Sequence, residues 1–218
     1  MNNGSLFDSK IFHFIERVVD ALIINVFWII CCLPIFTIGA ATSAMYYSIH
    51  KVVFQQRGYT REFWKAFKDN FKNSTIVWIP DALIIVFLMS DLYITDGMNQ
   101  RGEALGVLMI VCAIILCIVV TLSVFLFAYL ARFTDSVKRS IKNILFIAPV
   151  NFGATFGSFI IIGIMILATY LIPPAIIATP VLTVIALHPV YEGVFKQYMS
   201  EEDLKKEEEL DSDFINDK

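Results

Sequence analysis

The side chain with the clearest chemical potential in the sequence is Asp81, a carboxylate within an otherwise apolar stretch. It follows Pro80 and lies about 10–12 Å along a helix that begins near residue 74. A carboxylate is costly in hydrocarbon, so an intramembrane one is a functional candidate, for example on a transport pathway. The alternative is a structural carboxyl group that is protonated or bonded to a neighbouring hydroxyl. Two amides, Asn25 and Asn151, are further intramembrane polar candidates.

The sequence lacks the motifs of known catalysts. It contains no HExxH, no GxSxG, no Walker loop and no GxGxxG. The four cysteines lie in apolar runs without CxxC spacing or nearby histidines, so a zinc site is not expected. His188, alone before Pro189, is typical of a headgroup or helix-end contact. We therefore expect no catalytic residue, no bound metal and no cofactor.

The composition is that of a membrane protein. Of the 218 residues, 57% are hydrophobic and 17% charged, whereas soluble domains are nearer 45–50% and 25%. Apolar stretches of about 20 residues can cross a bilayer as helices. We predict an all-α polytopic membrane domain over residues 1–199, followed by an acidic cytoplasmic tail, 200–218. The predicted spans are 19–38, 74–93, 105–131, 152–171 and 173–190.

The basic residues give this domain an orientation. The segment 51–73 carries six Lys and Arg residues and the segment 132–149 carries four, whereas 94–104 carries one. Loops rich in Lys and Arg stay in the cytoplasm. The two basic segments and the C-terminus are therefore predicted to be cytoplasmic, and five spans place the N-terminus outside the cell membrane. Short membrane-flanking loops of this kind form no basic face for nucleic acid.

Two basic segments have the period of amphipathic helices. In 60–73 the aromatic residues fall on one arc and the cations on the next, and 137–150 follows the same plan. Such helices lie in the membrane interface with their cations among anionic headgroups, or dock a cytoplasmic protein. The segments also share a short pattern that suggests a parallel two-unit repeat. The candidate contact residues are Arg61, Trp64, Lys65, Lys68, Lys72, Lys138, Arg139 and Lys142.

The stretch 31–52 interrupts the first span at Pro34 and continues with small residues, among them Gly39 and Ser43, that favour close helix packing. Gly153 and Gly157 form a GxxxG motif of the same kind, for a helix of this chain or of a second copy. A cleaved signal peptide is excluded, because cleavage here would translocate the most basic segment. Two alternatives remain for 18–52: a kinked span, or a re-entrant hairpin that would return the N-terminus to the cytoplasm.

The segment 33–52, LPIFTIGAATSAMYYSIHKV, resembles the signature of the YesL family of small bacterial integral membrane proteins. The segment 63–72, FWKAFKDNFK, resembles the family's next block. The resemblance implies a membrane protein of unestablished activity, associated with carbohydrate uptake or its sensing in Gram-positive-type bacteria. The expected function is a non-enzymatic accessory whose partners are the bilayer, a sugar permease or sensor subunit, and a second copy of the chain. The alternative is a small transporter or channel with Asp81 on its pathway.

Overall fold

The computed structural model describes residues 3–54, 61–101, 105–199 and 201, and this part of the chain is helical throughout, without strands. The predicted acidic tail lies almost wholly outside the described residues. Short 3₁₀ helices at Ile35–Thr37 and Pro173–Ile177 and a π-helical turn at Ile49–Phe54 join the longer elements. The α-helices are α1 (Asn3–Cys32), α2 (Ile38–Ser48), α3 (Arg61–Gln100), α4 (Gly106–Arg132), α5 (Val137–Val150), α6 (Phe152–Leu171) and α7 (Thr179–Phe195).

The chain reverses direction between α1 and α2. Pro34 cannot continue a helix, and the Thr37 hydroxyl lies within hydrogen-bonding distance of the carbonyls of Cys31 and Pro34, which closes a tight turn. The Trp28 indole then donates to Thr42 Oγ1 at 3.3 Å. In one continuous helix these residues would lie about 21 Å apart. The segment 18–52 is therefore a helical hairpin and not a kinked span.

Helix α3 joins two elements that the sequence predicted to be separate, the amphipathic helix 60–73 and the span 74–93. Its predicted lipid-facing aromatic arc packs only in part inside the protein. Phe63 is fully buried, and its ring centroid lies 5.8 Å from that of Phe27 in α1. Trp64 remains 40% exposed and Phe71 37% exposed. The first amphipathic helix is thus the beginning of a long helix, and its Phe63 and Trp64 rings contact Phe27 of α1.

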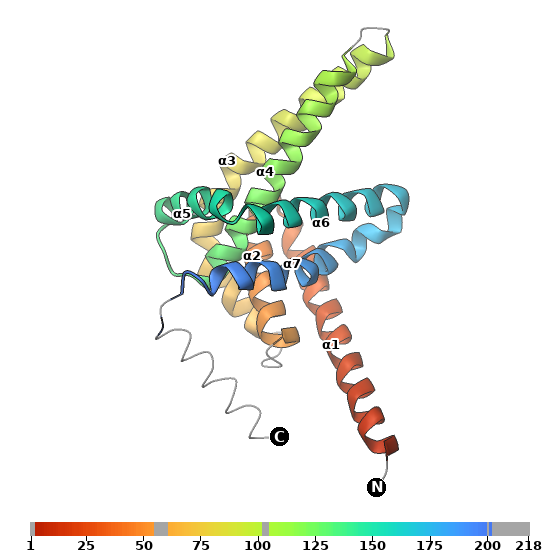
Figure 1. Ribbon diagram of the computed structural model, residues 1–218, viewed down its shortest axis with the longest axis vertical. Helices are drawn as coiled ribbons and strands as arrows, with labels where there is room; N and C mark the ends of the chain where they lie inside the picture. The colour runs from red at the N-terminus through yellow and green to blue at the C-terminus, as the bar shows by residue number, and fades with distance from the viewer. Residues whose placement is uncertain (1–2, 55–60, 102–104, 200, 202–218) are drawn as a thin grey trace.

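The hairpin of α3 and α4 projects away from the other helices (Figure 1). At its base α2 packs against both helices. The Ser43 hydroxyl donates to the carbonyl of Phe127 in α4 at 3.0 Å. A hydroxyl has one proton, so Ser74 of α3 must donate to Ser43 Oγ, 3.0 Å away. One small side chain therefore connects three helices.

Helices α6 and α7 form a second hairpin, which crosses the first one in Figure 1. In the predicted two-unit repeat, each amphipathic helix precedes a span. Asn151 separates the second amphipathic helix, α5, from its span, α6, whereas the first amphipathic helix and its span form the single helix α3. Three described helices are long and apolar enough to cross a membrane, namely α3, α4 and α6. Helix α7 has 17 residues, about 25 Å, which is shorter than a hydrocarbon core of about 30 Å. These three helices correspond to the predicted spans 74–93, 105–131 and 152–171, and the spans 19–38 and 173–190 stay predictions.

Candidate functional site

Five polar side chains from distant parts of the sequence meet in the interior where α2, α4 and α7 pack. We call them the His–Glu cluster: Tyr46, His50, Arg132, His188 and Glu192. Tyr46 belongs to α2, and His50 to the π-helical turn that follows it. Arg132 ends α4, and the last two residues lie on α7. The segment 132–149 and the inner end of the last span were predicted to be cytoplasmic, so the cluster lies at the predicted cytoplasmic end of the molecule.

The Glu192 carboxylate is held from two sides. Arg132 reaches both of its oxygens, with Nε 3.0 Å from Oε1 and Nη2 donating to Oε2 at 3.0 Å. The Tyr46 hydroxyl donates to Oε1 at 2.9 Å. Burial, and then the charge of Glu192, raise the pKa of Tyr46 well above its ordinary value. Tyr46 therefore stays a neutral donor, and the carboxylate is fixed in position and orientation.

The two histidines face one another beside this carboxylate. His50 Nδ1 lies 2.8 Å from His188 Nε2, and the ring centroids are 5.1 Å apart. One of these nitrogens must accept the shared proton, so at least one lone pair points into the contact. His50 Nδ1 is also 3.6 Å from Glu192 Oε1. The ligand atoms of His50, His188 and Glu192 all lie within 4.8 Å of one another, a set that could hold a metal ion.

Local structure explains why these side chains converge. His188 and Glu192 are four residues apart and therefore share one face of α7. Tyr46 and His50 have the same separation across the end of α2. The wider π turn at Ile49–Phe54 alters the direction of the side chains there, a feature often found at functional sites. Arg132 lies in the last turn of α4, where the helix dipole favours a cation.

Asp81, the main candidate from the sequence, pairs with a neighbouring helix. Ser123 Oγ of α4 lies 2.8 Å from Asp81 Oδ1 and also 2.8 Å from the carbonyl of Val119. A bond to a neighbouring hydroxyl is what the sequence predicted for Asp81 if its carboxyl group has a structural role. Asp81 lies at the interface between α3 and α4 and lines none of the cavities described below.

The other two polar candidates also join separate elements. The Asn25 amide of α1 is buried and donates to the carbonyl of Ile177, between α6 and α7. Asn151 donates to the carbonyl of Ile147 at 3.0 Å and to the hydroxyl of Tyr198 at 2.9 Å. Asn25 therefore connects α1 to the turn between α6 and α7. Asn151 connects the junction of α5 and α6 to the segment after α7.

The two predicted packing motifs differ in the structure. Gly39 is buried where a Cβ would lie 2.7 Å from Trp78 Cβ and 2.9 Å from the Ser74 carbonyl oxygen. A Cβ on Gly153 or Gly157 would meet nothing within 4 Å. The α2 glycine therefore permits close approach of α3, whereas no such close approach occurs at Gly153 or Gly157 of α6.

The predicted cations are exposed on α3 and α5. In the second group, Arg139 Nη1 lies 3.3 Å from Asp135 Oδ1, an exposed pair one helical turn apart. Exposed pairs of this kind add little stability. The exposed set comprises Arg61, Lys65, Lys68, Lys72, Lys138, Arg139 and Lys142.

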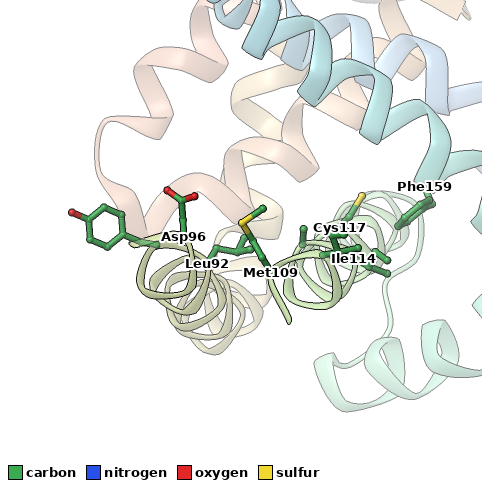
Figure 2. A pocket seen from close by; sticks show the side chains of 9 residues that line it. Leu92, Asp96, Met109, Ile114, Cys117 and Phe159 are labelled. Carbon is green, nitrogen blue, oxygen red and sulfur yellow. The ribbon is translucent and has the colours of Figure 1, made fainter. Parts of the chain in front are cut away.

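The α3–α4 hairpin carries a cavity of about 570 Å³, which also touches α6. Figure 2 shows that its labelled lining residues come mostly from α3 and α4, with Phe159 from α6. Its lining is almost entirely apolar, and Asp96 is its one carboxylate. A second cavity, of about 530 Å³ between α4 and α6, is lined by aliphatic and aromatic side chains and two threonines. Both cavities match hydrocarbon better than a polar solute.

The His–Glu cluster was not predicted from the sequence because its members are far apart. His50 and His188 are separated by 138 residues, and Glu192 lies just beyond the last predicted span. The available signal was the spacing of four residues between His188 and Glu192 within a helical period. A His and a Glu four residues apart in a helix indicate no particular chemistry until His50 is placed beside them.

The all-helical fold and its long apolar helices define the class: a helical membrane protein. A family model described as "Protein of unknown function, DUF624" matches residues 21–92 of this chain. The match covers about a third of the chain and spans the last part of α1, all of α2 and most of α3. No curated protein and no solved structure matches the chain.

Proposed function

We propose that this chain is a non-enzymatic accessory membrane protein that acts beside a carbohydrate permease or sensor. The carbohydrate association comes from the YesL resemblance, whose residues lie within the segment matched by the family of unknown function. The accessory role is supported by the way in which the intramembrane polar groups are used. It requires a folded scaffold with an exposed docking surface and no pathway across the membrane.

The observation that carries the proposal is the pairing of Asp81 with Ser123. A carboxylate on a transport pathway should face a polar cavity, whereas this one lies between two packed helices. Ser43, Ser74 and Asn25 likewise connect helices. The two cavities described above are lined almost entirely by apolar side chains. These features favour a packed scaffold over a transporter.

The docking surface in this proposal is the exposed basic side of α3, formed by Lys65, Lys68 and Lys72. The hairpin of α1 and α2 supports placing the N-terminus on the same side of the membrane as the start of α3, because the chain turns back before α3 begins (Figure 1). We therefore favour a cytoplasmic N-terminus over the outside location that five spans predicted. A cytoplasmic basic surface can contact an acidic partner or anionic headgroups.

The functional test is co-purification with a sugar permease of the source organism after mild solubilisation. The wild-type chain should retain the permease, and the variant Lys65→Glu/Lys68→Glu/Lys72→Glu should lose most of it. The matched control is Lys138→Glu/Lys142→Glu, which changes exposed cations on α5. Wild-type chain recovered without any permease, or equal losses in both variants, would contradict the proposal.

The sidedness is tested separately by cysteine labelling of intact cells with a membrane-impermeant maleimide. The background is a chain with its four cysteines replaced by serine. A cysteine at Asn3 should react only after the membrane is opened, as should one at Lys65. A cysteine at Arg101 should react in intact cells. Labelling of the Asn3 position in intact cells would restore the outside location.

A further inference from the structure

We propose that His50, His188 and Glu192 form a binding site for a divalent transition-metal ion, with Zn²⁺ as the best match. The inference is independent of the accessory function above. It rests on three buried potential ligands whose donor atoms lie within 4.8 Å of one another. Two imidazoles and one carboxylate are a known three-ligand set for zinc with an open fourth position.

Two of the three distances between ligand atoms suit a metal after small movements, and the third pair lies within 4.8 Å. Zinc–ligand bonds of about 2.0–2.2 Å in a tetrahedron separate neighbouring ligand atoms by about 3.3 Å. His50 Nδ1 is 2.8 Å from His188 Nε2 and 3.6 Å from Glu192 Oε1. On binding a metal, the distance between the two histidine nitrogens would increase by about 0.5 Å, and the distance from His50 Nδ1 to Glu192 Oε1 would decrease by about 0.3 Å. Neutral histidines supply both lone pairs when their protons are on His50 Nε2 and His188 Nδ1.

The carboxylate has room for one more partner. An ionised carboxylate offers about four lone-pair positions. Tyr46 and Arg132 Nη2 donate to two of them on Glu192, and Arg132 Nε lies 3.0 Å from Oε1 as an ion-pair contact. These partners also fix the orientation of the carboxylate, as outer groups do at established metal sites. Arg132 offsets the negative charge that a cation would meet, so we expect weaker affinity than at a site of thiolates.

The donor atoms also determine which metal ions the site prefers. Imidazole ligands suit zinc, copper, nickel and iron, whereas Mg²⁺ and Ca²⁺ take oxygen ligands. Two of the three donors here are nitrogens. Zn²⁺ and Co²⁺ should therefore bind, and Mg²⁺ should not compete with them.

The test uses the full chain, purified in mild detergent with a tag that lacks histidine. After chelator treatment it is titrated with Zn²⁺ and, in parallel, with Co²⁺, whose visible absorption reports tetrahedral nitrogen and oxygen ligation. We expect one ion per chain and a metal-dependent rise in Tm. Wild-type chain that takes up no stoichiometric Zn²⁺ would overturn the proposal, whatever its variants do.

Variants then assign the ligands. His50→Gln and His188→Gln should each lower the affinity at least about tenfold, and Tyr46→Phe should lower it about 10–100-fold through the lost orienting bond. His13→Gln, at the third histidine of the chain, is the matched control and should bind as the wild type does. A folded His188→Gln chain that binds with unchanged affinity would overturn the assignment. So would an equal loss in the His13→Gln chain.

Discussion

Gly39→Ala should test the packing of the α1–α2 hairpin on α3 directly. An added Cβ would lie 2.7 Å from Trp78 Cβ, 2.8 Å from Phe127 Cε1 and 2.9 Å from the Ser74 carbonyl oxygen. Ordinary contacts between heavy atoms are about 3.5–4.0 Å. The Phe127 ring can rotate, but the two α3 atoms move only with their helix. Helices α2 and α3 must therefore separate by about 0.8 Å.

That separation has two costs. Overpacking of a tightly packed interior costs about 1–3 kcal/mol. The bond between the Ser43 and Ser74 hydroxyls, now 3.0 Å, would lengthen beyond hydrogen-bonding distance. Polar bonds between membrane helices contribute about 0.6–1.7 kcal/mol. Alanine's higher helix propensity offsets about 1 kcal/mol of these costs, so the free energy of unfolding should fall by about 1–4 kcal/mol.

The assay is denaturant unfolding in a mild detergent, followed by loss of helical circular dichroism. Gly157→Ala is the matched control, because a Cβ there meets nothing within 4 Å. Alanine is a better helix former than glycine by about 1 kcal/mol, so the control should be as stable as the wild type or slightly more stable. If Gly39→Ala unfolds within about 0.5 kcal/mol of the wild type, the close approach of α2 and α3 is wrong.

Two further substitutions address the buried polar groups. Glu192→Gln should lower the free energy of unfolding by about 3–5 kcal/mol, because it leaves the Arg132 charge unbalanced where both side chains are only 8% exposed. Adding Arg132→Gln should recover part of that loss, and a double variant as unstable as the sum of the single ones would contradict the pairing. Asp81→Asn keeps an oxygen that accepts from Ser123, so unfolding should change by less than about 1 kcal/mol. A solute flux in reconstituted vesicles that Asp81→Asn abolished would contradict a structural role for this carboxylate.

The sequence predicted the elements whose signal is local. The spans 105–131 and 152–171 agree with α4 and α6 to within about a residue, because long apolar runs end where polar residues or turns begin. The helix 137–150 agrees with α5. The boundary at residue 73 is wrong because a change from polar to apolar composition does not interrupt hydrogen bonding along a helix. Pro80, which could have broken α3, is accommodated within it.

The residues alone indicate a helical, apolar chain that suits a membrane, and they show which of its segments are basic. The packing of the helices, by contrast, shows that the chain turns back after Pro34, since the bond from Trp28 to Thr42 needs two helix faces brought together. It also decided that Phe63 covers α1 instead of lipid. The His–Glu cluster belongs to the same category, because its histidines are 138 residues apart. Composition and period act over neighbouring residues, whereas a site of this kind exists only after α2, α4 and α7 have packed.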